Sequence, residues 1–209
     1  MKKVLTAIAV SALIFSASMA HADIDLGIAA GIAYPHDIEK FSFDGAASVD
    51  FKINPLFSLG VQTGFNWVRN DISSGDKQSW GGTEITESLT ENIYTFPLLL
   101  NATFIFPVGQ TGFQSPVTPF LTVGAGYAWS FFRSDGEGDN QTFKGLAYQA
   151  ITGVLIDMGP QAQGMKLKLE AGYRGTDVKA SIGGSTYELP MSSWIARVGV
   201  VFNVGGRGW

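Results

Sequence analysis

Residues 118–132 read TPFLTVGAGYAWSFF, and their side chains alternate between two kinds. The odd positions from Leu121 to Phe131 are apolar or aromatic, whereas the even positions from Thr122 to Ser130 are glycine, alanine, serine or threonine. Successive side chains of a β-strand point to opposite faces of its sheet. The segment is therefore expected to be a strand with one broad apolar face and one narrow face.

The same alternation recurs along the chain and predicts eight strands. Their expected ranges are 24–34, 41–53, 56–69, 93–106, 118–132, 143–158, 165–175 and 191–204. Each range reaches or exceeds the roughly 9–11 residues that a tilted strand needs to cross a bilayer, whereas strands of soluble proteins usually have about 5–6 residues. The expected fold class is an all-β, eight-stranded antiparallel up-and-down transmembrane β-barrel.

Residues 1–22 have the pattern of an export signal. Lys2 and Lys3 precede an apolar stretch over 4–15, and Ala20-His21-Ala22 forms an A-x-A cleavage site. The alternative, a retained anchor, is disfavoured because the apolar stretch is short for a spanning helix. We therefore expect a cleaved signal peptide over 1–22 and one outer-membrane barrel domain over 23–209, without a further domain, in a Gram-negative envelope.

The composition excludes several classes of function. The chain contains no cysteine, so disulfides and thiolate metal sites are impossible. Removing Lys2 and Lys3 leaves 12 Lys and Arg against 18 Asp and Glu, a net charge of −6. Nucleic-acid binding needs a basic surface, so no nucleic-acid partner is expected. No segment of 23–209 has eighteen consecutive apolar residues, so a closed barrel is the remaining way to cross a bilayer.

Aromatic residues on the apolar faces are predicted to form two girdles around an aliphatic belt. One girdle is expected to contain Tyr34, Trp67, Tyr94, Tyr127, Trp129, Tyr173 and Trp194, and the other Phe51, Phe57, Phe104 and Phe120. Amphipathic rings prefer the depth of the lipid headgroups. The girdles therefore favour a membrane barrel over a lipocalin-like soluble barrel, whose apolar side chains would face inward.

Charged residues on the narrow faces are predicted to line the lumen. They are Asp50, Lys52, Asp157, Lys166, Lys168, Glu170, Arg174 and Arg197. An eight-stranded barrel is only wide enough for side chains to fill, so opposite charges should pair, with Glu170–Arg197 as one pair between neighbouring strands. Either the pairs form a structural plug, or they exchange partners in a narrow pore for ions or small hydrophilic solutes.

Three stretches carry a family resemblance. Residues 119–127 (PFLTVGAGY) and 96–104 (FPLLLNATF) resemble the central strands of the eight-stranded outer-membrane barrels of the OmpA transmembrane-domain and opacity type. Residues 197–204 are similar to the family's assembly signal, through Arg197, Gly199, Phe202 and Val204. The resemblance implies insertion into the outer membrane by the barrel-assembly machinery. It departs at 205–209, which extend past the last expected strand, so the internal match is the preferred signal.

Catalytic and metal-binding patterns are weak. His36 is the only histidine of 23–209, and no G-x-S-x-G sequence occurs, so no enzyme and no cofactor are expected. Asp135, Glu137 and Asp139 have the first acidic spacings of a calcium loop but lack its later glycine and glutamate. A solvated acidic loop is expected there, with a weak cation contact as the alternative.

The expected function follows from these exclusions. We expect an integral outer-membrane barrel with a structural or surface-interaction role, which displays acidic extracellular loops. Its expected partners are outer-membrane lipid and lipopolysaccharide, to which the acidic loops would need bridging cations. The alternatives are the narrow pore and a lipid-modifying barrel enzyme.

Overall fold

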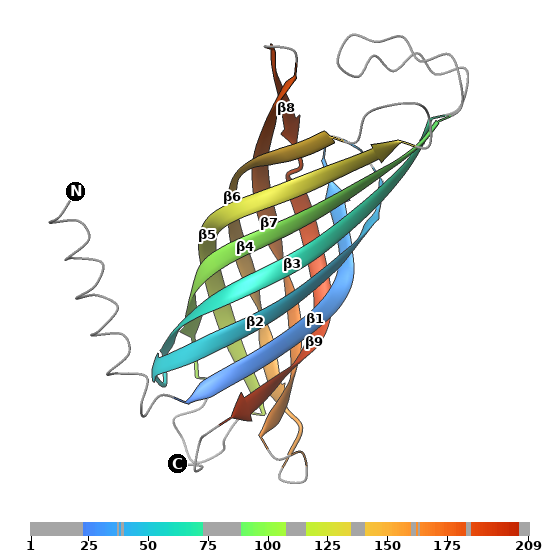
Figure 1. Cartoon of the computed structure of the whole chain (residues 1–209). Coiled ribbons are helices and arrows are strands. Elements are labelled where there is room, and N and C mark those ends of the chain that lie inside the picture. The colour runs from blue at the N-terminus through green and yellow to red at the C-terminus, as the bar shows by residue number, and fades with distance from the viewer. Residues whose placement is uncertain are drawn as a thin grey trace, which may run out of the picture.

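Antiparallel strands wrap into a closed barrel in the computed structural model (Figure 1). The structure describes residues 23–36, 38, 40–72, 89–107, 116–134, 141–159, 162, 164–182 and 185–204. Within these residues the strands are β1 (Ile24–Pro35), β2 (Ser42–Asn54), β3 (Phe57–Ile72), β4 (Leu89–Ile105), β5 (Val117–Ser134), β6 (Gln141–Asp157), β7 (Met165–Ile182), β8 (Ser185–Pro190) and β9 (Ser193–Val204). The predicted signal peptide lies outside the described residues. Among the described residues, no helix is long and apolar enough to span a membrane.

Eight of these strands form the barrel wall, as predicted. Each wall strand pairs with its sequence neighbour, β7 pairs with β9, and β9 closes the barrel by pairing with β1. The pairing of Ile24 with Val204 places the start of β1 and the end of β9 at one end of the barrel, which we call the base. Pro35 pairs with Ser193 at the opposite end, which we call the crown.

The sequence predicted no strand between 175 and 191, and this is wrong. β7 continues to Ile182 and pairs there with the short strand β8, forming a hairpin at the crown (Figure 1). Residues 177–182 pair with 185–190, and residues 177–179 also pair with 144–146 of β6, so the hairpin continues from the wall at the crown. The two residues that join these strands are Gly183 and Gly184, a pair that favours tight hairpins.

The strands are strongly staggered around the barrel. Following the paired residues from Asp25 through each strand in turn leads back to β1 at Pro35, ten residues further along. Closing a barrel with such a stagger requires strands that are tilted by roughly 35–45°. As a consequence, residues that are far apart in the sequence, and that lie on strands that are not neighbours, meet inside the lumen.

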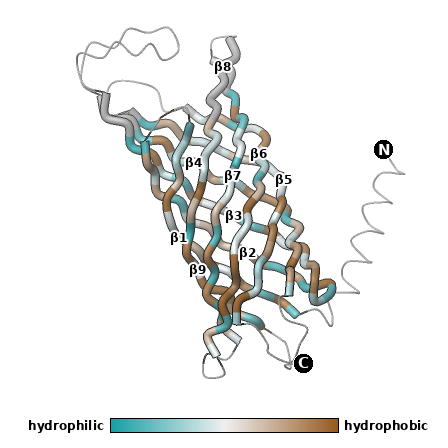
Figure 2. The backbone as a smooth tube through the Cα atoms, turned by 180° about the vertical axis from the view of Figure 1, so that it is seen from behind, coloured by the Kyte–Doolittle hydropathy of each residue, from teal (hydrophilic) through white to brown (hydrophobic). Residues whose placement is uncertain are grey.

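Side chains alternate between the two faces of the wall, and Figure 2 shows apolar and polar residues interleaved along the strands. Leu100, Leu146 and Ile28 face outward and are 70%, 68% and 57% exposed. Such a continuous apolar exterior suits lipid rather than water. The inward positions between them are buried and mostly small or polar.

The outward aromatic residues lie toward the two ends of the strands. Near the crown, the rings of Tyr173 and Trp194 pack 5.3 Å apart, and those of Tyr127 and Trp129 pack 5.2 Å apart. Tyr34, Trp67 and Tyr94 belong to the same end of the wall. Near the base, the rings of Phe57 and Phe104 are 5.2 Å apart, and Phe51 lies on neighbouring β2.

The assignment of Phe120 to the outer girdle is wrong. Phe120 is only 2% exposed and faces the lumen, because it shares the even parity of Thr122 on β5. Its ring fills space beside Gly153, and Nζ of Lys168 lies 5.1 Å from the ring centroid. The ammonium and the ring therefore form a cation–π contact inside the barrel.

Candidate functional site: a charged network in the lumen

The lumen network is built from β2, β7 and β9. On each strand an outward apolar residue precedes an inward charged one: Phe43 before Asp44, Tyr173 before Arg174, and Ala196 before Arg197. Alternation thus turns all three charged side chains into the lumen. They are almost completely buried there.

Asp44 is the centre of this network. Its Oδ2 accepts a hydrogen bond from Nη1 of Arg174 at 2.7 Å, and its Oδ1 accepts one from Nη1 of Arg197 at 3.0 Å. Nδ2 of Asn66 lies 3.5 Å from the same carboxylate and 3.0 Å from Oγ of Ser42. One buried carboxylate is therefore shared by two guanidinium groups, which makes the hydrogen bonds charge-assisted.

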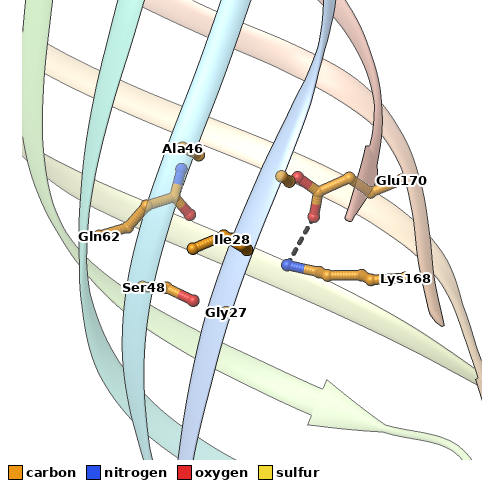
Figure 3. A pocket seen from close by; sticks show the side chains of 8 residues that line it. Gly27, Ile28, Ala46, Ser48, Gln62, Lys168 and Glu170 are labelled. Atoms are coloured by element: carbon orange, nitrogen blue, oxygen red, sulfur yellow. Dashed lines mark ion pairs between the residues drawn. The ribbon is translucent and has the colours of Figure 1, made fainter. Parts of the chain in front are cut away.

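Glu170 extends the network toward the base. Its carboxylate contacts Nε of Arg197 and lies 2.6 Å from Nζ of Lys168. Figure 3 shows the Lys168–Glu170 pair. The predicted Glu170–Arg197 pair is present, and the two residues are register partners on β7 and β9. The result is a row of alternating charge, Arg174–Asp44–Arg197–Glu170–Lys168.

A layer of amide side chains lies beside the charged row. Gln62, Asn101 and Gln149 come from β3, β4 and β6. Gln62 Oε1 accepts hydrogen bonds from Nδ2 of Asn101 at 3.0 Å and from Nε2 of Gln149 at 3.1 Å, and that same Nε2 lies 3.0 Å from Oδ1 of Asn101. Because two other strands separate β3 from β6 in the wall, the bond between Gln62 and Gln149 spans part of the lumen, whereas Asn101 lies on the strand next to β3.

The remaining predicted lumen charges lie nearer the base and outside the charged row. Lys52 pairs with Asp25 at 2.9 Å, and Nδ2 of Asn203 donates to Asp25 at 2.8 Å. Asp50 accepts a hydrogen bond from Oγ of Ser48 at 2.9 Å. Asp157 and Lys166 are register partners at the ends of β6 and β7, where Asp157 is exposed.

Sequence reasoning missed several members of the site. Asp44 was not among the expected lumen charges, although it has the same parity as Asp50 and Lys52 on the same strand. Asp25 and the amide layer were also missed, although the alternation of side chains along their strands places these residues on the inward face. With Asp25 and Asp44 added to the eight predicted lumen charges, the set contains five acids and five bases.

The interior is filled up to the backbone. A Cβ added at Gly60 would lie 2.1 Å from Oδ1 of Asp50, and one at Gly124 would lie 2.0 Å from Oδ1 of Asn101. These glycines leave room for the polar side chains of the neighbouring strand. Between Gln62 and the Lys168–Glu170 pair, a cavity of about 10 Å³ remains (Figure 3). This is the space of about one water molecule.

The described residues contain no group of three His, Cys, Asp or Glu side chains that could hold a metal ion. Asp135, Glu137 and Asp139, the weak candidates, lie outside the described residues. His36 is exposed at the crown, where its backbone N–H donates to the carbonyl of Ser192 at 2.9 Å.

The four residues of the expected assembly signal divide between the two faces of β9. Arg197 belongs to the lumen network, and Gly199 also faces inward, against the backbone of Ile28. Phe202 and Val204 face outward and are 40% and 50% exposed. Recognition of this pattern by the assembly machinery stays a prediction.

Comparison with known proteins agrees with this architecture. The model of the outer membrane protein beta-barrel domain matches residues 6–202. A curated relative from Gluconacetobacter diazotrophicus, named outer membrane protein, is 32% identical over 136 residues, which cover 61% of this chain and 30% of the relative. The chain thus spans under a third of that relative's length.

A solved structure shows a similar fold. Neisserial surface protein A is 16% identical and has a TM-score of 0.55, with 88% of this chain and 97% of that protein covered. The attachment invasion locus protein of Yersinia pestis is 13% identical, with a TM-score of 0.45 over 87% of this chain and 97% of that protein. The chain belongs to the outer membrane protein β-barrel domain family and is an integral outer-membrane protein.

Proposed function

We propose that this protein is a closed outer-membrane scaffold with a structural or surface-interaction role, which holds its crown toward the cell exterior. The observation that carries the proposal is the polar network that joins strands which are not neighbours in the wall, through the lumen. Asp44 on β2 binds Arg174 on β7, and Gln62 on β3 binds Gln149 on β6. A solute would have to break both sets of contacts to pass.

The energy of these contacts supports a closed lumen. Separating a buried ion pair leaves an uncompensated charge, at a free-energy cost of about 3–5 kcal/mol. At 1.36 kcal/mol per factor of ten, an arrangement with one such pair broken is populated below about 1%. The cavity beside Glu170 has a volume of about 10 Å³, the space of about one water molecule.

The orientation follows from the connections at the two ends. Outer-membrane barrels have short periplasmic turns and longer extracellular loops. At the base, β2 and β3 are joined through 55–56, whereas at the crown β3 and β4 are joined through 73–88. The connection between β3 and β4 carries Asp76, Glu84 and Glu87 against Lys77 in its sequence. These charges favour a cationic or cation-bridged partner.

The alternative function is a narrow pore in which the ion pairs exchange partners. One observation favours it: Nε and Nη2 of Arg174 and Nη2 of Arg197 are buried without a hydrogen-bond partner among the described residues. A guanidinium with free N–H groups can donate a hydrogen bond to another acceptor when an ion pair opens. We place this alternative second, because the amide layer would still cross the lumen after such an exchange.

Current recordings from planar bilayers distinguish the two functions. The closed scaffold predicts no discrete openings from purified wild-type protein or from Arg197→Ala, whose amide layer is intact. Discrete openings from the wild type that disappear or change size in Arg197→Ala would support the pore instead. The third idea, lipid modification, is tested by the mass of lipid A from cells with and without the protein; unchanged masses speak against it.

A further inference from the structure

The lumen contains an apolar cluster beneath the crown. Outer-membrane barrels have a polar interior, so buried apolar side chains inside this one need a reason. They come from five neighbouring strands and from the segment that precedes β9. The members of this crown cluster are Val68 on β3, Ile93 and Leu99 on β4, Ala128 on β5, Phe143 and Ala147 on β6, Val178 on β7, and Met191.

The crown cluster lies on the crown side of the charged row. On β7, Val178 is two inward positions nearer the crown than Arg174, and on β3, Val68 is one inward position nearer the crown than Asn66. Nδ2 of Asn66 in turn contacts the Asp44 carboxylate. Water that approaches Asp44 from the crown would therefore meet the cluster first.

Ile38 covers the cluster from the other side of the barrel. It belongs to the connection between β1 and β2, is partly buried, and packs against the crown cluster. Close to it, the backbone N–H of His36 donates to the carbonyl of Ser192 at 2.9 Å. Ser192 directly follows Met191, a member of the cluster. The apolar contacts thus join β3–β7 to the side of the wall that β1, β2 and β9 form.

We propose that the crown cluster is an apolar seal that keeps water away from the charged row, with Ile38 as its lid. Apolar constrictions stop ions because water is not stable inside them. Exclusion of water also strengthens the pairing of Asp44 with its two guanidinium groups, since charges attract more strongly at low dielectric. The seal is a barrier separate from the amide layer, and it would keep the crown end closed even after the polar network is broken.

Single cysteines that react with a charged methanethiosulfonate reagent test the seal, because the chain has no cysteine of its own. Ala128→Cys adds only a sulfur atom at a cluster position that is 0% exposed. His36→Cys at the crown and Asp157→Cys at the base are the references, since both positions are exposed. In micelles, which leave both ends open to the reagent, we expect Ala128→Cys to react roughly 100-fold more slowly than either reference, because a buried group reacts only when the structure around it opens.

Ile38→Ser tests the lid. Added to Ala128→Cys, it should raise the reaction rate roughly tenfold, because less apolar surface then holds the lid on the cluster. His36→Ser is the matched control: it changes an exposed residue of the same connection and should leave the rate unchanged. Ala147→Cys, at a cluster position that is 2% exposed, replaces Ala128→Cys if that variant fails the heat-modifiable gel test of folding.

Two results would overturn the proposal. One is a reaction of the cluster cysteine as fast as that of His36→Cys, and the other is an unchanged rate when Ile38→Ser is added. The thiol reaction reports access to the crown half of the lumen, whereas bilayer currents report passage through the whole barrel. A reactive cluster cysteine without discrete openings would therefore refute the seal and leave the closed-lumen proposal standing.

Discussion

Replacing Asp44 with asparagine removes the carboxylate that two buried guanidinium groups share. Asparagine keeps the volume of the side chain, so the change is one of charge. Arg174 and Arg197 are then left with Glu170 as their remaining buried carboxylate, and Glu170 already pairs with Lys168. Because removing one partner of a buried ion pair costs about 3–5 kcal/mol, we expect the free energy of unfolding to fall by about that amount.

Urea unfolding of the barrel refolded into lipid vesicles measures this change, with tryptophan fluorescence and heat-modifiable gel mobility as two readouts. Asp157→Asn is the control: its carboxylate is exposed at the base, where an ion pair contributes about 0–1 kcal/mol. Combining Asp44→Asn with Arg174→Gln should recover part of the loss, because one uncompensated cation is removed. A loss below about 1 kcal/mol for Asp44→Asn would refute the role of Asp44 as the centre of the network.

Four further substitutions test the filling of the lumen, each by the same urea measurement. Gln62→Ala and Gln149→Ala should each lower the free energy of unfolding by about 1–3 kcal/mol. The double variant should lose less than the sum of the two single losses, because both substitutions remove the same hydrogen bonds. Strictly additive losses would count against the amide layer. Gly126→Ala should be destabilising by at least about 1–3 kcal/mol, since its Cβ would lie 2.0 Å from the carbonyl oxygen of Leu98 on the paired strand; wild-type stability would show that the strands can separate there. Phe120→Ala should lower the free energy of unfolding by about 3–5 kcal/mol, because it leaves a cavity in the lumen. A loss near zero would indicate that the Phe120 side chain faces the lipid instead.

The wall of the barrel could be predicted from the sequence because its signal is local. A membrane strand must present apolar side chains to lipid at every second position, as residues 121–131 of β5 do. The hairpin of β7 and β8 lies beyond the described wall pairing of β7 with β9, where neither face has to be apolar. Its strands are stabilised by pairing with each other. The alternation of apolar residues therefore does not reveal them in the sequence.

The site was predictable only in part, for a related reason. Parity placed Glu170 and Arg197 inside, and adjacent strands in register made them a pair. Asp44 and Arg174 are 130 positions apart in sequence and meet across the lumen. Which residues meet in this way depends on the ten-residue stagger of the whole barrel, which no single strand reveals. Phe120 is aromatic like the girdle residues, but its even position on β5 places it in the lumen.

The central claim is that a continuous polar network closes the lumen. The most direct test is the ion current through planar bilayers that contain purified wild-type protein, recorded alongside Arg197→Ala. We predict no discrete openings from either protein, because the bonds of Gln149 to Gln62 and Asn101 join strands that are not neighbours in the wall, through the lumen, in both. Reproducible discrete openings from the wild-type barrel would contradict this account.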